Sequence, residues 1–243
     1  MVNLYNRQSL ISNLQSPTMR FLIHEQPYEK PLAAGAYRYE REGQPTGAVE
    51  SWRLTQATAD FMVLRVDVDE RAVNGRSTLY HYLQQKNGRP ERLTYRLWDG
   101  ATRIEGKLIF NDTSVIGTRT VNGTTVEEDI EVATGYGFWF PTAVGAGTAV
   151  LSHTKLQNHA LTLNSATLAL QPIAKLSVLP LPGLGETMML GQKEITYYWT
   201  QIIWDQQQMM RLGQVQAGYP VWGAWMDGLT AVATRYFWYQ AQG

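Results

Sequence analysis

Ionisable side chains interrupt the apolar faces of segments that alternate like β-strands. Glu128 lies between Val126 and Ile130, and His81 stands between two leucines. Residues two apart in a strand point to the same face, so both side chains fall among apolar neighbours. A positioned carboxyl or imidazole group accelerates proton transfer by about 10²–10⁴-fold. The pattern therefore predicts Glu128 and His81 as the acid or base of a catalytic site.

Both residues also have a structural interpretation. A lone histidine on an apolar face is usually a core residue whose hydrogen bonds are satisfied. Full burial can raise the pKa of a carboxyl group by ~3–5 units. Glu128 therefore pairs with a cation such as an arginine, or faces a polar cavity, or the inferred strand register is wrong by one residue. A strand register shifted by one residue would instead turn three carboxylates, Glu127, Asp129 and Glu131, toward the apolar interior. Burying three carboxylates costs more free energy than burying one.

Five further residues are candidates for ligand binding. Tyr95 lies on an apolar strand face, and Gln201 shares a face with Tyr197 and Trp199. Trp139 belongs to an aromatic, glycine-rich segment. Sites for drug-sized molecules are mostly apolar and aromatic, with a few polar groups that set orientation. Tyr95, Tyr197 and Trp199 are also the residue types that ordinarily pack in a core or wall, whereas Gln201 is more informative, because a buried amide without hydrogen-bond partners is penalised.

Turn residues divide the chain into short alternating runs from about residue 36 onward. Asn-Gly pairs occur at 74–75, 87–88 and 122–123, and Asp-Gly pairs at 99–100 and 227–228. Such pairs between alternating runs indicate hairpins, and Asn74-Gly75 predicts a type I′ turn. The first predicted strands are 36–41, 49–55, 60–70, 76–86, 92–98, 104–110, the segment between 112 and 122, and 124–132.

The second half of the chain is less regular. Residues 133–148 are rich in glycine and aromatic residues, which predicts either a cover over a cavity mouth or a linker between two half-sheets. Further strands are expected at 149–157, 160–170, 173–179, 221–226 and 229–239. Residues 193–215 also fit a helical stripe, but their β-favouring composition predicts two strands joined near 205–208. A short amphipathic helix is expected within residues 1–17.

These elements predict an all-β fold with about 12 to 14 strands in an antiparallel meander. Open sheets of that size tend to curl or close, because unpaired edges invite aggregation. We therefore expect residues 1–243 to form one domain, a barrel or a strongly curved half-barrel. By strand count alone, this outline resembles lipocalin-like and lipoprotein-carrier-like sheets, although no motif residue supports membership of either family.

Composition excludes several classes of function. The chain has no cysteine, and 21 basic residues balance 21 acidic ones, which argues against nucleic-acid binding. No apolar run approaches the 18 residues of a membrane span, and no export signal is recognisable, so we expect a cytoplasmic protein. His153 and His159 lack a third ligand nearby, so neither a metal nor another cofactor is expected.

Three functions fit these observations. The first is binding of a hydrophobic or aromatic small molecule in a β-barrel cavity, with cofactor-free cyclisation, isomerisation or dehydration if the site is catalytic. The second is a non-catalytic carrier of a lipid or pigment. The third is a structural protein, such as a homodimer, whose interface uses the C-terminal region that holds five of the eight tryptophans.

Overall fold

The computed structural model describes residues 25–150, 159–204 and 208–238. The expected helix within 1–17 and most of the expected strand at 149–157 lie outside these residues. The described residues are mostly strand, as predicted, with two helical segments of four residues each, α1 (Arg71–Asn74) and α2 (Gly147–Val150). None of the helices described is long and apolar enough to cross a membrane.

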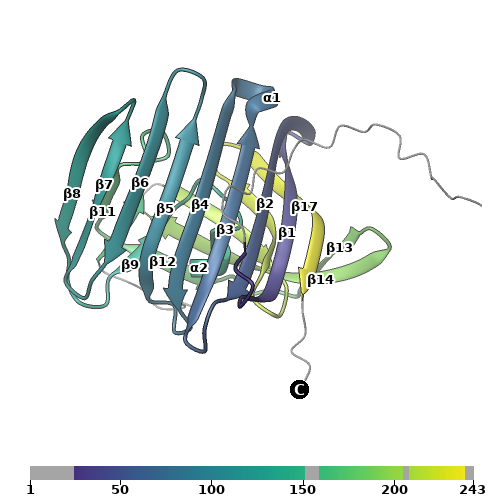
Figure 1. The fold of residues 1–243 in the computed structure, drawn as a ribbon. Coiled ribbons are helices and arrows are strands. Elements are labelled where there is room, and N and C mark those ends of the chain that lie inside the picture. The colour runs from purple at the N-terminus through teal and green to yellow at the C-terminus, as the bar shows by residue number, and fades with distance from the viewer. Residues whose placement is uncertain (1–24, 151–158, 205–207, 239–243) are drawn as a thin grey trace, which may run out of the picture.

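The first half of the chain forms a continuous antiparallel meander. Each strand pairs with the next one along the chain, and together they form the layer at the front of Figure 1. The strands are β1 (Lys30–Arg41), β2 (Gln44–Gln56), β3 (Phe61–Glu70), β4 (Arg76–Gln85), β5 (Pro90–Trp98), β6 (Arg103–Phe110), β7 (Ser114–Val121) and β8 (Thr124–Glu131).

The C-terminal strands extend the same sheet from its other side. They are β12 (Leu176–Pro180), β13 (Glu186–Leu190), β14 (Lys193–Trp204), β15 (Gln208–Gln214), β16 (Pro220–Trp225) and β17 (Leu229–Trp238). β17 pairs with β1, and the order then continues through β16, β15 and β14 to β12, with β13 paired to β14. The two strands predicted within 193–215 are thereby confirmed as β14 and β15.

The sheet does not close into a barrel. Its two end strands are β8 and β12, which do not pair with each other in the described residues. A separate three-stranded sheet of β9 (Gly137–Trp139), β10 (Ala160–Leu163) and β11 (Leu170–Ile173) lies behind the front layer in Figure 1. β9 and β10 are parallel, whereas the other described strand pairs are antiparallel. The predicted antiparallel meander is therefore confirmed. The closed barrel, one of the two predicted forms of the sheet, is wrong.

The hairpins predicted from the Asn-Gly pairs are present, but the turn types differ. Asn122 and Gly123 both have positive φ (50° and 87°), as a type I′ turn requires. Asn74 does not: it ends helix α1, and Gly75 caps that helix in the left-handed region with φ 80°. The type I′ prediction at Asn74-Gly75 was therefore wrong, because the chain inserts a helical turn between β3 and β4.

The aromatic segment 136–148 is part of the hydrophobic core. Phe138, Trp139 and Phe140 are all at least 96% buried. The ring of Tyr82 on β4 packs against Phe138 and Phe140, with centroids 6.0 and 5.7 Å away. Aromatic rings thus fill the space inside this part of the sheet, where a central cavity was expected.

Glycine and a buried carboxylate fix the path of this segment across β2. The backbone N–H groups of Val144 and Gly145 donate to Glu50 at 2.9 and 2.6 Å, and Tyr39 donates a third hydrogen bond to the same carboxylate. A Cβ at Gly145 would stand 2.7 Å from the Trp52 side chain, so the backbone can approach β2 only without a side chain there.

Candidate functional site

Two adjoining hollows lie on the face of the sheet opposite the core. The first has a volume of about 370 Å³ and crosses β3 to β7, and the second, of about 470 Å³, extends it toward the β5–β6 turn. Both volumes lie within the range of about 300–1,000 Å³ found for small-molecule sites. We call this pair of hollows the outer groove. Its polar lining residues in the first hollow are Arg65, Thr94, Arg96, Glu105, Lys107, Thr118 and Thr120.

Strand register places these side chains in two adjacent rows. Thr94 pairs with Lys107, which pairs with Thr118 on the next strand. One step along, Arg96 pairs with Glu105. Because alternate residues share a face, these side chains all stand on one side of the sheet. The short threonines leave space between the long charged side chains, which form the walls of the groove.

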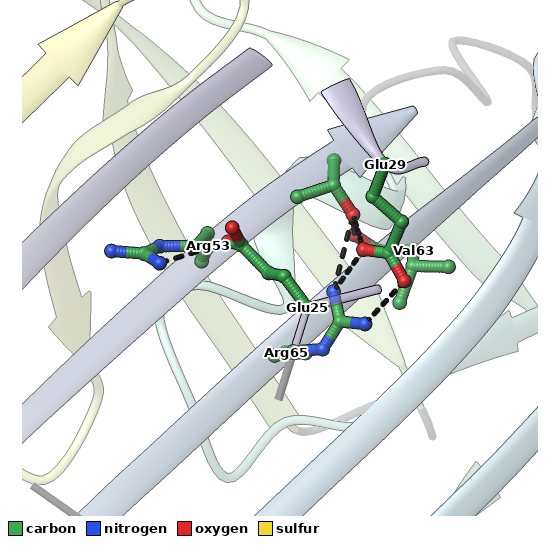
Figure 2. Close-up of polar contacts among 6 residues, drawn as sticks. Glu25, Glu29, Arg53, Val63 and Arg65 are labelled. Carbon is green, nitrogen blue, oxygen red and sulfur yellow. Dashed lines mark hydrogen bonds and ion pairs between the residues drawn. The ribbon is translucent and has the colours of Figure 1, made fainter. Parts of the chain in front are cut away.

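Arg65 at the edge of the groove is held by the segment that precedes β1. Its two terminal nitrogens donate to the two oxygens of Glu29 at 2.8 and 2.7 Å, and both side chains are at least 96% buried. Figure 2 shows this pair beside Val63, with the more exposed pair of Glu25 and Arg53 next to it. A bidentate pair of this kind fixes the Arg65 side chain.

The remaining charges leave the groove with an excess of positive charge. Glu105 lies 3.4 Å from Arg96 and 2.7 Å from Arg103, so two arginines share one carboxylate. Lys107 has no ion pair among the residues described. The hydrogen bond from Arg103 chiefly keeps the pKa of Glu105 below its usual value. The groove therefore favours an anion.

His81 lies on the same face of the sheet as the outer groove. It pairs in register with Arg65 on β3 and Thr94 on β5, so it lies on the groove face. Burial, followed by the charges of Arg65 and Arg92, lowers the pKa of His81 to about 4. The imidazole is consequently neutral at neutral pH, and the expected position of His81 in the core is not what the structure shows.

Glu128 and Tyr95 are brought together on the opposite, core-facing side. Glu128 accepts hydrogen bonds from Arg119 Nε at 2.8 Å and from the Leu170 amide at 3.3 Å. Tyr95 lies two strands from Arg119, and its ring crosses Gly106, where a Cβ would stand 2.1 Å from the ring. The pairing of Glu128 with an arginine was one of the alternatives that the sequence left open.

Two buried oxygen atoms in this interior cluster have no hydrogen-bond partner among the described residues. They are the Tyr95 hydroxyl and Glu128 Oε2. Burial, together with the charge of Glu128, raises the pKa of Tyr95 well above its usual value, so its hydroxyl stays protonated. A donor and an acceptor are therefore present near Arg119. Glu128 and His81 lie on opposite faces of the sheet, so the structure does not unite them in one site.

The other predicted residues separate into two places. Trp139 lies in the core, where its ring packs edge-on against Trp204 with centroids 5.9 Å apart. Tyr197 and Trp199 meet at 5.4 Å on the face of β14 opposite the buried Ile202. Gln201 lies on that same face, and its side-chain amide donates to the sulfur of Met209 rather than to Tyr197 or Trp199.

The sequence analysis missed Glu50 and the outer groove. Glu50 alternates with Ala48 and Trp52, so the signal that singled out Glu128 was present there as well. The groove gave no such signal, because its arginines, lysine and threonines match an ordinary solvated strand face. Within the described residues, no three His, Asp or Glu side chains are grouped so that they could hold a metal ion.

Comparisons with known proteins show no family for this chain. No protein-family model matches it, and no curated protein matches it. A crystal structure of a DUF1089 family protein from Pseudomonas aeruginosa is similar at 10% identity, with a TM-score of 0.43. That similarity covers 71% of this chain and 87% of the other.

Proposed function

We propose that this protein binds a small amphipathic molecule with an anionic group in the outer groove. The observation that carries the proposal is a hollow of about 370 Å³ in which Lys107 has no carboxylate partner among the described residues. Two arginines, Arg96 and Arg103, both pair with Glu105. An anionic group near Lys107 would supply the charge that the groove lacks.

The chemistry of the lining matches the two ends of such a molecule. Thr94 and Thr118 flank Lys107 in register, and their hydroxyl groups can donate hydrogen bonds to an oxyanion. Trp98 lines the second hollow and is 45% exposed, so it offers an aromatic surface to an apolar group. Leu79 lines both hollows and provides apolar contact between the two ends.

This proposal keeps the small-molecule class expected from the sequence but moves the ligand from the interior to the outer face. Acid–base chemistry at Glu128 remains a second candidate function. Its support is the pair of buried, unpartnered oxygens on Tyr95 and Glu128 beside Arg119. His81 cannot assist Glu128 on the same substrate, since the sheet separates them.

Two fluorescent probes of similar shape test the groove. Anilinonaphthalene sulfonate carries an anionic group, whereas phenylnaphthylamine is its neutral counterpart. We expect Lys107→Gln to weaken binding of the sulfonate by about two- to fivefold, the effect typical of one exposed ion pair. Binding of the neutral probe should not change. Lys193→Gln, which removes an exposed lysine on β14, is the matched control.

Salt and Trp98 provide the two remaining arms of this experiment. Raising the ionic strength should weaken binding of the sulfonate to the wild-type protein and leave Lys107→Gln less affected. Trp98→Ala should weaken both probes, because it removes apolar contact rather than charge. Equal sulfonate affinities for Lys107→Gln, Lys193→Gln and the wild-type protein would refute the proposed groove site.

A further inference from the structure

A second group of side chains with binding chemistry lies on β13, β14 and β16, away from the outer groove. Its centre is the carboxylate of Glu186 on β13. The Tyr197 hydroxyl donates to one oxygen of Glu186 and the Trp199 indole N–H donates to the other, each at 2.8 Å. The two aromatic side chains therefore hold the carboxylate in a fixed orientation.

Three aromatic rings form a cluster beside this carboxylate, and two of them are nearly parallel. The rings of Tyr197 and Trp222 are within 20° of parallel, with centroids 6.2 Å apart. Trp199 is inclined by 85° to Tyr197 and by 69° to Trp222, at centroid distances of 5.4 and 6.3 Å. The Tyr197 ring can lie this close to the backbone of β15 because residue 213 is glycine. A Cβ at Gly213 would stand 2.6 Å from the ring.

The charge of Glu186 is not balanced by a cation within the described residues. Hydrogen bonds from Tyr197 and then Trp199 lower the pKa of Glu186, so the carboxylate is ionised at neutral pH. Trp199 and Trp222 are both partly exposed, which leaves aromatic surface accessible beside the charge. A negative charge next to aromatic faces is the environment that attracts organic cations.

We propose that Glu186, Trp199 and Trp222 bind a quaternary ammonium group, while the buried Tyr197 orients Glu186 from behind. Such a cation needs no hydrogen-bond acceptor and interacts through its charge and its methyl groups. A primary ammonium gains most where several acceptors face its three N–H groups, whereas both Glu186 oxygens already accept a hydrogen bond here. A hard metal ion would require six or more oxygen ligands. The quaternary ammonium class therefore fits the cluster best.

Calorimetric titration with choline tests the proposal on the full-length protein. The neutral control ligand is dimethylbutanol, in which carbon replaces the choline nitrogen. We expect choline to bind about tenfold more tightly than dimethylbutanol, and Glu186→Gln to remove this difference. Glu194→Gln, which removes an exposed carboxylate from β14, should bind both ligands like the wild-type protein.

Nuclear magnetic resonance gives a second readout that depends on the location of the ligand. The Trp199 indole N–H signal, assigned by its loss in Trp199→Phe, should shift with choline and not with dimethylbutanol. Cosedimentation with phosphatidylcholine vesicles would identify a lipid headgroup as the source of the cation, and binding to choline alone would identify a free metabolite. Equal affinity for choline and dimethylbutanol, or no saturable choline binding, would overturn the proposal.

Discussion

Glu50 is an ionisable residue enclosed by the core. It is 99% buried and accepts hydrogen bonds from Tyr39, Val144 and Gly145. Burial raises the pKa of Glu50 to about 7, although these hydrogen bonds act in the opposite direction. Glu50 therefore links the aromatic segment 136–148 to β2 and makes the stability of that contact depend on pH.

The sign of this pH dependence follows from the raised pKa. The stabilisation due to protonated Glu50 is fully present below the unfolded-state pKa of about 4.3 and is lost as the pH rises through about 7. At 1.36 kcal/mol per pKa unit, the loss amounts to about 3–4 kcal/mol. We therefore expect Glu50→Gln, which does not titrate, to become more stable relative to the wild-type protein between pH 5 and pH 8.

Urea unfolding of both proteins across this pH range measures the difference. The constant effect of Glu50→Gln on hydrogen bonding cancels when its value at one pH is subtracted from that at another. Glu194→Gln serves as the control for removal of an exposed carboxylate. If the difference in unfolding free energy between Glu50→Gln and the wild-type protein did not change with pH, Glu50 would have the same pKa in the folded and unfolded states.

At the scale of strands, the hairpins were predictable because their signals are local. The dipeptide Asn122-Gly123 carries both the position and the type of its turn. The face of β4 was not predictable in the same way, since Tyr80 and Tyr82 alternate with Leu79 and Leu83 and both faces contain apolar residues. Pairing with Val66 and Tyr95 decides that the tyrosines face the core.

Residues 193–204 show the same limit. The set containing Tyr197, Trp199 and Gln201 is more apolar than the set containing Ile202 and Trp204. Ile202 and Trp204 face the core because Trp204 meets Trp139, a contact between segments 65 residues apart in the sequence. Nearer the start of the strand, Tyr197 is buried and Tyr198 is exposed. Strand existence follows from local composition, whereas the assignment of faces depends on long-range partners that periodicity does not contain.

Gly106 on β6 determines how Tyr95 on β5 packs, and this dependence can be tested. A Cβ at Gly106 would stand 2.1 Å from Cζ of Tyr95, whose side chain is 2% exposed, so the ring would have to shift. We expect Gly106→Ala to destabilise the protein by about 1–3 kcal/mol, the usual effect of overpacking. The free energy of unfolding in urea measures the effect.

A double-mutant cycle separates this clash from a general effect on the strand. In Tyr95→Leu the ring is absent, so adding Ala at position 106 should then destabilise the protein less than it does in the wild-type background. Additive effects of Gly106→Ala and Tyr95→Leu would show that the ring does not depend on the missing Cβ.

The whole molecule has an open sheet, and its two end strands are protected in different ways. β12 is short and ends at Pro180. β8 is eight residues long and carries exposed Glu127, Asp129 and Glu131 on one face. Open edges invite pairing with another chain, and charged side chains on the edge strand oppose it. The acidic row on β8 thus takes the place of the closure that a barrel would provide.

Removing these charges should therefore promote association of the protein with itself. We expect the triple variant Glu127→Thr, Asp129→Thr and Glu131→Thr to form dimers or larger species, because threonine favours strands and carries no charge. Sedimentation velocity over a range of protein concentrations measures the association. High salt should promote it weakly in the wild-type protein, since screening only partly removes the repulsion between exposed charges.

A control with the same net charge distinguishes edge protection from general repulsion. Glu42→Gln, Asp112→Asn and Glu194→Gln together remove three exposed carboxylates outside β8. The control should sediment like the wild-type protein while the β8 variant associates, because β8 is an eight-residue end strand that pairs only with β7 among the described strands. Equal association of both variants would mean that net charge, and not the acidic edge strand, keeps copies of this open sheet apart.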